Sequence, residues 1–426
     1  MKKILALALA LVMVFALCAC GQSAAPAAAP AADDAADEDI AYVLCETGDT
    51  YSQGLGTYFQ EAFEAAGGKV IFESFPKDTS DFTSYLVKAS QEDADLIFAP
   101  NSTTVASNLL AQAADKGIEV PIMAGDTWES SVILDGVKDT ELDVYCSTFF
   151  DENDTSGPAS AFVTGFKEWL NADSQRLTNN GGNDIVAAVS ALGFDAYNTA
   201  YAAVEAALNA KGADATSVDV ATALWAVDIS DAVTGSIKFD AKGDAIKDSA
   251  YIKYAGQEGF EFVKVQTIAN DAEQAAAADY AAGGIAIENN VIRIGVYEPQ
   301  SGANGAGGKQ EILGAQYAQS LKPTITVGED EYTVELDIQD NGSDDTTGKT
   351  AAAKLVSDKC IVVLGSYGSG VSIAAAETFE AASVPAIGCS CTNPQVTDGK
   401  PFYFRICFLD PFQGSVMAAF ALEQIA

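Results

Sequence analysis

Apolar runs of strand length alternate with amphipathic stretches along most of this chain, and this alternation limits its fold more than any other feature. The strand-like runs cover residues 40–45, 69–75, 95–100, 120–125, 292–297 and 360–365. Stretches with the apolar spacing of helices lie between them, at residues 58–66, 82–89, 105–114, 353–357 and 373–382. Strands that are apolar throughout need cover on both faces, which helices provide when a sheet is parallel. The sequence therefore predicts an α/β protein with doubly wound parallel sheets.

The length and charge of the chain narrow the possible classes. Its 426 residues are enough for two lobes that each bury a core, and 49% of them are hydrophobic, which argues against global disorder. The formal net charge is −37, so the surface repels nucleic-acid backbones and anionic lipid headgroups. The chain has no histidine, which excludes Ser-His-Asp and Cys-His catalytic sets and histidine metal sites. We expect neither an enzyme nor a nucleic-acid-binding protein.

The N-terminal segment has the features of an export signal. Two lysines precede an apolar stretch that is too short to cross a bilayer. Cys20 follows, with Leu17 three residues before it and the small Ala19 immediately before it. This pattern predicts a lipoprotein signal peptide over residues 1–20 with Cys20 as the lipid acceptor; the alternative is an ordinary secretory leader or a membrane span. Residues 21–39 are rich in Ala, Pro and acidic residues, which predicts a flexible tether.

Six cysteines lie beyond this segment: Cys45, Cys146, Cys360, Cys389, Cys391 and Cys407. An even number in an exported chain is compatible with disulfides. Most of the six lie in or beside apolar runs, where a thiol behaves as a small hydrophobic group. We therefore predict free thiols rather than disulfides.

Two Gly/Ser-rich turns follow neighbouring strand-like runs. Residues 365–370 leave backbone N–H groups free at a predicted helix start, where a carboxylate can bind. Residues 390–394 follow the next apolar run, at 384–387. In open α/β sheets the carboxyl ends of strands line the ligand site, so both turns are candidates. Turns of this kind are common, and alone they are weak evidence for a binding site.

Other segments match cofactor or metal motifs only in part. Residues 302–309 and 343–350 each lack a glycine that a phosphate loop requires. Residues 151–154 and 340–345 are acidic but lack the full spacing of a calcium loop. We therefore expect no nucleotide, cofactor or metal site.

Segments of both halves resemble one known family, but in rotated order. Those of the second half resemble the opening lobe of the leucine/isoleucine/valine-binding family of type I periplasmic solute receptors: IRIGVYEPQSGANGAGGKQEILGAQYAQ, VVLGSYGSGVSIAA, PAIGCSCTNPQVT and YFRICFLDPFQGS. Those of the first half are similar to the segments that come after that lobe in the family: AYVLCETGDTYSQGLG, DFTSYLVKA, DLIFAPNST and PIMAGDTWESS. The resemblance implies a circularly permuted chain. The alternatives are a misassembled gene or a fragment of a tandem fusion.

The resemblance further implies two doubly wound lobes joined by a hinge with three crossings. One lobe would comprise residues 150–233 and 292–409, and the other residues 40–148, 236–268 and 411–426. The crossings would fall near residues 145–149, 229–236 and 408–411. An Ala-rich connector at residues 269–291, with a helical middle, would join the family's C-terminal end to its N-terminal end.

Five residues receive ligand-binding roles from the resemblance. Ser369 and Thr392 fall at positions where hydroxyl and amide groups hold the α-carboxylate of an amino acid. Ser390 falls where a backbone carbonyl accepts from the α-ammonium, and Asp126 falls where a carboxylate of the opposite lobe pairs with it. Tyr51 matches the tyrosine that reaches the ligand carboxylate on closure. The alternatives are a turn residue for Asp126 and a core or rim aromatic for Tyr51.

The predicted side-chain pocket departs from the branched-chain pattern. Positions that hold bulky aromatic residues in the leucine-binding relatives hold small ones here: Gly307, Ala191 and Ser102. The predicted site also includes Tyr367, at a position where an aliphatic residue lines the family pocket. Trp128 and Cys391, which lie close in sequence to the residues above, complete it. The resemblance thus predicts a retained grip on the α-amino acid group and a larger or more polar ligand.

The expected function is that of an extracytoplasmic solute-binding lipoprotein on the outer face of the bacterial cytoplasmic membrane. It would capture an amino acid or similar small zwitterion by lobe closure, without a chemical step. Its partners would be the permease of an ABC importer and the attached ATPase subunits, and the protein itself would be a monomer. The alternative is a sensory ligand-binding module of the same fold.

Overall fold

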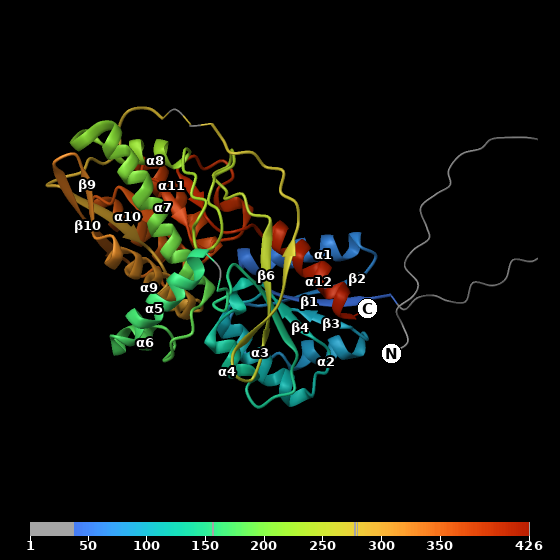
Figure 1. Cartoon of the computed structure of the whole chain (residues 1–426). Coiled ribbons are helices and arrows are strands. Elements are labelled where there is room, and N and C mark those ends of the chain that lie inside the picture. The colour runs from blue at the N-terminus through green and yellow to red at the C-terminus, as the bar shows by residue number, and fades with distance from the viewer. Residues whose placement is uncertain (1–37, 156, 277, 279, 426) are drawn as a thin grey trace, which may run out of the picture. The chain divides into compact units, whose positions relative to one another are not determined.

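The computed structural model describes residues 38–155, 157–276, 278 and 280–425, and these form two sheets with helices on both faces (Figure 1). The seven-stranded sheet has the order β2-β1-β3-β4-β5-β6-β7. Its strands are β1 (Ile40–Glu46), β2 (Lys69–Phe75), β3 (Leu96–Phe98), β4 (Ile122–Ala124), β5 (Val144–Thr148), β6 (Ser249–Ala255) and β7 (Phe260–Thr267). The first five are parallel to one another, and β6 and β7 are antiparallel additions at one edge.

The six-stranded sheet has the order β13-β12-β11-β8-β10-β9. Its strands are β8 (Val291–Val296), β9 (Thr324–Val327), β10 (Asp330–Ile338), β11 (Val362–Leu364), β12 (Ala386–Gly388) and β13 (Tyr403–Arg405). All pair in parallel except β9, which pairs antiparallel with β10. The structure therefore confirms the predicted α/β class with two mainly parallel sheets.

Helices cover both sheets. The seven-stranded lobe contains α1 (Thr50–Ala65), α2 (Thr83–Gln91), α3 (Thr103–Lys116), α4 (Ser131–Val137) and α12 (Asp410–Ile425). The six-stranded lobe contains α5 (Gly157–Asn171), α6 (Ser174–Asn179), α7 (Ala188–Lys211), α8 (Ser217–Leu224), α9 (Gly305–Leu321), α10 (Asp345–Ser357) and α11 (Ser369–Ala382). Short 3-10 turns occur at η1 (Asp126–Trp128), η2 (Gly212–Asp214) and η3 (Pro394–Val396).

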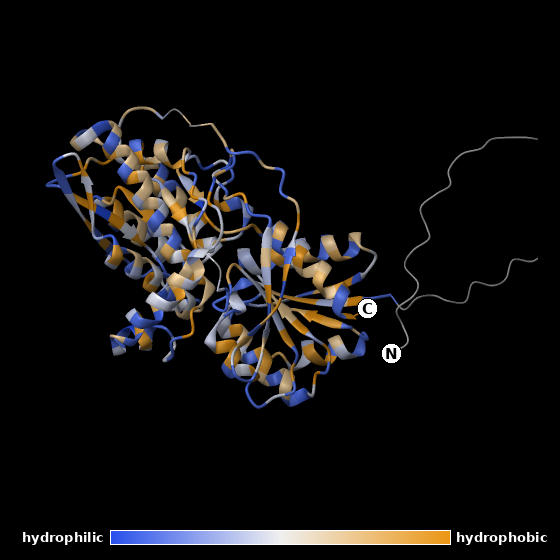
Figure 2. Cartoon of the chain, in the orientation of Figure 1, coloured by the Kyte–Doolittle hydropathy of each residue, from blue (hydrophilic) through white to orange (hydrophobic). Residues whose placement is uncertain are grey.

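The central strands, such as β1, β3 and β4, are buried on both faces, as their continuous apolar sequences predict. In β1, Val43 shares a core with Phe59 of α1, whereas its neighbour Leu44 shares a different core with Leu109 of α3. Successive side chains of a strand point to opposite faces, so the two cores lie on opposite sides of the sheet. Figure 2 shows the hydrophobic colours concentrated on the strands of the seven-stranded sheet.

The return of the chain to the seven-stranded sheet occurs later than the predicted boundary at residue 236. Residues 237–247 still pack on the six-stranded lobe, where the Phe239 ring lies 5.1 Å from that of Phe404. Asp244 forms a bridge with Arg405 of β13 and a buried ion pair with its guanidinium, at 2.6 Å. The chain joins the other sheet only at β6.

The predicted helix in the Ala-rich connector is absent from the residues of this segment that the structure describes. The described residues of the connector instead run along the six-stranded lobe in extended and irregular conformation. The Tyr280 hydroxyl donates to the Pro401 carbonyl and accepts from the Trp225 indole N–H at 2.7 Å. The Ala275 amide donates to the Phe239 carbonyl at 3.0 Å. These contacts with the lobe replace the internal hydrogen bonds that a helix would have made.

The cysteines, the possible membrane spans and the N-terminal segment were also the subject of predictions. All six cysteines beyond the leader are free and buried. Within the described part of the chain, no helix is both long and apolar enough to cross a bilayer. Cys20, the predicted signal peptide and the tether up to residue 37 lie outside the described residues.

Candidate functional site

The predicted binding residues lie in loops and first helical turns that follow the carboxyl ends of parallel strands in both lobes. In the seven-stranded lobe, Tyr51 follows β1 and Asp126 follows β4. In the six-stranded lobe, Ser369 lies in the loop-to-helix turn after β11, and Ser390 and Thr392 follow β12. Ligands bind at this edge in open α/β sheets because neighbouring loops diverge there.

The two sets of loops face each other. The Asn393 side chain of the six-stranded lobe donates to the Thr50 carbonyl of the seven-stranded lobe at 3.2 Å. The Thr103 hydroxyl donates across the same boundary to the Ala303 carbonyl at 3.3 Å. The structure therefore brings the early and late segments of the sequence together in one place.

Local structure fixes the position of Tyr51. Helix α1 begins after Asp49, whose carboxylate caps the helix by accepting from the Ser52 amide at 2.7 Å. Tyr51 therefore lies in the first turn, with its hydroxyl directed toward the loop after β4. Gly125 permits this approach, because a Cβ there would lie 2.3 Å from the Tyr51 hydroxyl oxygen.

Asp126 is a buried carboxylate, and only one of its two oxygens accepts hydrogen bonds from the described residues. Its Oδ1 accepts from the Tyr51 hydroxyl at 3.0 Å and from Gln413 Nε2 at 2.8 Å. Its Oδ2 has no hydrogen-bond partner among the described residues, and the residue is only 2% exposed. Burial raises the pKa of Asp126 to about 6, partly offset by the bonds from Gln413 and Tyr51. The free oxygen can accept from a cationic donor of a ligand.

The six-stranded lobe contributes hydrogen-bond donors, namely backbone amides and a hydroxyl group. Ser369 is the first residue of α11, whose N-cap Gly368 provides no side-chain cap. The first amides of such a helix are free to bind an anion, and the helix dipole favours a negative charge there. Thr392 is fully buried, and its hydroxyl lacks a partner within the described chain. The Ser369 hydroxyl accepts from the Asn393 amide at 3.2 Å, which joins the two loops.

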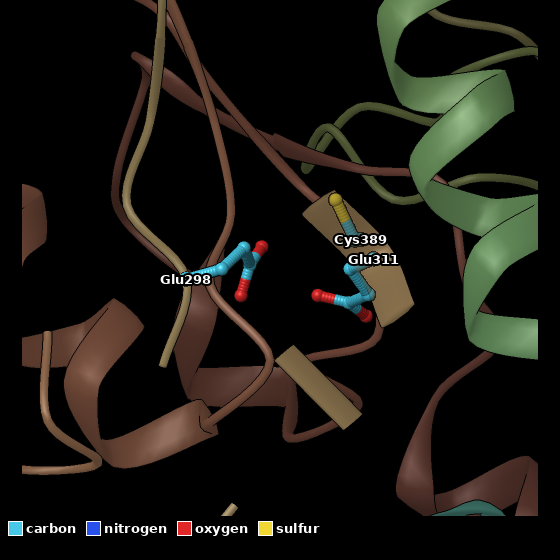
Figure 3. A group of neighbouring side chains, drawn as sticks. All are labelled: Glu298, Glu311 and Cys389. Carbon is cyan, nitrogen blue, oxygen red and sulfur yellow. The ribbon is translucent and has the colours of Figure 1, made fainter. Parts of the chain in front are cut away.

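Two acidic residues of the six-stranded lobe, Glu298 and Glu311, lie behind these loops, and the sequence analysis missed both. Glu298 Oε2 accepts from the Tyr367 amide at 2.6 Å, and Glu311 Oε1 accepts from the Ser390 hydroxyl. Figure 3 shows the two carboxyl groups facing each other, with Cys389 nearby. Burial raises the pKa of Glu298 to about 7, and burial together with the Glu298 charge raises the pKa of Glu311 well above its ordinary value.

Tyr367 lies over Gly307, one of the small residues at the predicted pocket positions, and occupies the space that a larger side chain would have taken. A Cβ on Gly307 would lie 2.3 Å from a carbon of the Tyr367 ring. Burial raises the pKa of Tyr367, and the charges of Asp126 and Glu311 raise it further. The ring therefore lies near anions of both lobes, and the pocket that the sequence predicted to be enlarged at Gly307 is filled there by the tyrosine.

Three of the predicted residues contribute to packing or to helix capping. Trp128 belongs to the apolar core of the seven-stranded lobe, and its indole N–H donates to the Asn101 carbonyl at 3.1 Å. Cys391 belongs to a core of the other lobe. Because their side chains help to form these cores, we leave Trp128 and Cys391 out of the candidate site. Ser102 caps α3 by accepting from the Val105 amide at 3.4 Å, and it lies at the rim of the facing loops.

Asp410 and Gln413 of α12 contact the predicted site residues and are further candidates that the sequence analysis missed. The Asp410 amide donates to the Thr392 carbonyl at 2.9 Å. Its carboxylate is fully buried, and neither oxygen has a hydrogen-bond partner in the described part of the chain. Burial raises the pKa of Asp410 to about 8, although the nearby Thr392 hydroxyl lowers it somewhat. An acidic residue next to a proline at a helix start gives no sequence signal beyond that of an ordinary cap.

Comparison with known proteins gives a family match over most of the chain. The model of the family described as "Periplasmic binding protein" matches residues 14–258 and 291–425. An amino acid binding protein of Pseudomonas aeruginosa is 35% identical over 128 residues, which are 29% of this chain and 34% of the relative. The Leu/Ile/Val-binding protein homolog 1 of Brucella abortus is 32% identical over 151 residues, 35% of this chain and 40% of the relative. The chain thus spans little more than a third of the length of these curated relatives.

Solved structures give weaker likenesses. The leucine binding protein LivK of Thermotoga maritima is 22% identical with a TM-score of 0.44, over 54% of this chain and 61% of that one. The branched-chain amino acid binding protein LivJ of Streptococcus pneumoniae, in complex with isoleucine, is 21% identical with a TM-score of 0.42, over 54% and 60%.

Proposed function

We propose, because this chain belongs to the periplasmic binding protein family, that it captures an amino acid or similar small zwitterion between its two lobes. The relatives named above as amino acid binding and Leu/Ile/Val-binding proteins support this solute class. The chain would carry out no chemical step and would deliver the solute to the permease of an ABC importer.

One observation carries the proposal: on each side of the boundary between the lobes, a buried polar atom has no hydrogen-bond partner among the described residues. Asp126 contributes a free carboxylate oxygen from one side. Thr392 contributes a free hydroxyl from the other side, next to the uncapped start of α11. Burying a zwitterion requires an acceptor for its ammonium and donors for its carboxylate, or the cost of desolvation would prevent binding. These groups supply both.

Lobe closure follows from the same arrangement. A ligand held by Thr392 and Ser369 on one lobe would reach Asp126 and Tyr51 on the other only when the lobes meet. Its affinity for the closed state would therefore exceed its affinity for an open one, and binding would shift the population toward closure. The closed form would be the form that the permease recognises.

Export and anchoring are part of the proposal. The predicted signal peptide with Cys20 as the lipid acceptor supports attachment to the outer face of the cytoplasmic membrane. The acidic and Ala/Pro-rich segment after Cys20 would then keep the binding lobes clear of the membrane surface. We propose that the protein acts there as a monomer.

Titration calorimetry tests the function directly. The mature chain carrying Cys20→Ser, which cannot be lipidated, is titrated with a panel of neutral, acidic and basic amino acids. We expect binding of at least one of them with a stoichiometry of one, and a matching rise in the midpoint of thermal unfolding. If none of them gives heat or a thermal shift, the proposed function is wrong.

A further inference from the structure

On and behind the facing loops lie more buried carboxylates than a simple zwitterion requires. Asp126, Glu298, Glu311 and Asp410 are each at most 2% exposed. Each has at least one carboxylate oxygen without a hydrogen-bond partner in the described parts of the chain. An α-ammonium group would satisfy one such oxygen on Asp126. The remaining carboxylates call for further donors.

Within the part of the chain that the structure describes, no cation is paired with these four carboxylates. The buried cations there are Lys253 and Arg405, and both have other acidic partners. Lys253 is paired with Glu129 and, at 3.4 Å, with Asp151. Arg405 is paired with Asp244 at 2.6 Å. An ionised carboxylate that is buried without a counter-charge is costly, so a cation from elsewhere would be strongly favoured.

Glu298 and Glu311 are held in the geometry of a binding site. One oxygen of each is fixed by a donor on a loop, the Tyr367 amide for Glu298 and the Ser390 hydroxyl for Glu311. The other oxygen of each, Glu298 Oε1 and Glu311 Oε2, has no partner among the residues that the structure describes. The two carboxyl groups point toward one another (Figure 3). An ammonium or guanidinium group has enough donors to satisfy both free oxygens at once.

The position of this pair fits the side chain of a bound amino acid. Glu311 is bonded to Ser390, two residues before Thr392, and Glu298 is bonded to Tyr367, two residues before Ser369. The pair therefore lies directly behind the two loops that would hold the α-carboxylate. The charge of Glu311 and that of Asp126 both act on the Tyr367 hydroxyl. The acidic pair and Asp126 thus both lie near the same tyrosine.

We propose that the solute carries a second cationic group, an amine or a guanidinium, that Glu298 and Glu311 bind. The substrate class is then the basic α-amino acids. This inference rests on the proposed function, since it assumes that the α-amino and α-carboxylate groups are held as described above. The net charge of −37 acts in the same direction, because it attracts cationic solutes to the protein.

Two other occupants are possible outcomes of the test. A divalent cation would use the two carboxylates and Cys389, whose ligand atoms lie within 4.8 Å of one another. Such binding would require the Cys389 thiolate, whereas burial raises the pKa of that thiol well above its ordinary value. A proton shared by the two carboxyl groups would satisfy the pair without any ligand and would make it a brace for the loops. The basic and the neutral member of each ligand pair would then bind alike, no metal would bind, and the inference would be wrong.

The test compares ligands that differ in charge but not in shape. The unlipidated mature chain is titrated calorimetrically with L-arginine and with L-citrulline, its neutral isostere, and with L-lysine and L-norleucine. We expect the basic member of each pair to bind at least about tenfold more tightly, as a buried charge-assisted hydrogen bond implies. This comparison requires no variant and therefore does not depend on whether a variant folds.

Variants then locate the effect. Glu298→Gln and Glu311→Gln should each weaken arginine binding about tenfold and leave citrulline binding nearly unchanged. Glu331→Gln, at an exposed position of β10, is the matched control and should change neither.

Three further outcomes overturn the inference. If neutral amino acids bind and basic ones do not, the second cationic group is excluded while the proposed function stands. If no amino acid binds, the proposed function fails as well. If Zn²⁺ or Mn²⁺ alone binds the wild-type chain and loses affinity in Glu298→Gln, with arginine and citrulline binding alike, the pair is a metal site.

Discussion

At the scale of single residues, the site depends on polar atoms that the fold buries without satisfying them. Asp126 Oδ2 and the Thr392 hydroxyl are the two that the proposed function uses. A buried polar group without a partner is costly, so proteins retain few of them. Their position at the boundary between the lobes supports the proposed ligand site.

Asp126→Asn should weaken ligand binding by about tenfold to a hundredfold, because it removes the charge that pairs with the ligand ammonium while preserving the shape of the side chain. Calorimetry with the best ligand from the amino acid panel measures the effect. Asp330→Asn, at an exposed position of β10, is the matched control and should have no effect. Equal affinity in both variants would remove Asp126 from the site.

The ligand-free protein should lose stability as the pH rises from about 4 to about 8. The pKa values of Asp126 and Asp410 are raised to about 6 and about 8, whereas an unfolded aspartate titrates near 3.9. The folded state therefore holds more protons than the unfolded state in this window, so the free energy of unfolding falls as pH rises.

Asp410→Asn separates the two contributions. Desolvation is the main cause of the raised pKa of Asp410. The charges of Asp126 and Asp49 raise this pKa further, while the Thr392 hydroxyl and the Arg405 charge lower it. The variant should have a weaker pH dependence, with its largest gain in the thermal unfolding midpoint above pH 8. Parallel pH profiles for the variant and the wild type would contradict the assignment.

At the scale of elements, helix packing decides where the acidic pair lies. Glu311 is on α9, which packs against α7 at very short range. A Cβ on Gly314 of α9 would lie 1.9 Å from the Ser190 carbonyl oxygen, and a Cβ on Gly193 of α7 would lie 2.1 Å from the Glu311 carbonyl oxygen. The two glycines allow the backbones to approach this closely, and the approach sets the position of Glu311 behind Ser390.

Gly314→Ala should therefore destabilise the protein by about 1–3 kcal/mol, as overpacking of a well-packed contact does, and should also weaken ligand binding. Chemical denaturation and calorimetry measure the two effects. Gly136→Ala in α4 is the control, because its Cβ would meet only the Leu110 side chain, at 3.2 Å from a terminal carbon and 3.6 Å from Cβ, and no backbone atom. A neutral Gly314→Ala would show that the two helices can move apart without cost.

The elements themselves were largely predictable from the sequence. The apolar run at residues 40–45 is β1, and the run at residues 69–75 is β2. The Ala-rich part of the connector was predicted to be helical, but its described residues form no helix, and the Ala275 amide bonds to the six-stranded lobe instead. Local propensity decides a helix only where tertiary contacts do not compete with it.

At the scale of the whole molecule, segments from opposite ends of the described chain pack together in one lobe. The final helix α12 packs on α1 of the lobe that opens the described chain, where a Cβ on Gly414 would lie 2.7 Å from the Phe59 amide nitrogen. We propose that the chain is a circular permutation of the family order. A cut at a surface connection leaves the packed core unchanged.

Re-ordering the chain tests the permutation. A version that begins at residue 291 and joins residue 425 to residue 40 by a short flexible linker should fold, bind the same ligand and have nearly the same affinity. Circular dichroism and calorimetry provide the measurements. A re-ordered chain that is unfolded, or folded but unable to bind, would show that the present order is required.

The amino-acid sequence by itself determined the two-sheet α/β architecture, the strand-like runs and the Gly/Ser turns that come after them. These features depend on how neighbouring residues along the chain bury their apolar side chains, which periodicity records. Only the tertiary structure decided that Trp128 belongs to a core and that Glu298 and Glu311 share a buried space behind Ser390. Strand order and helix packing bring such residues together over long distances along the chain, and no local pattern in the sequence specifies which polar groups will meet.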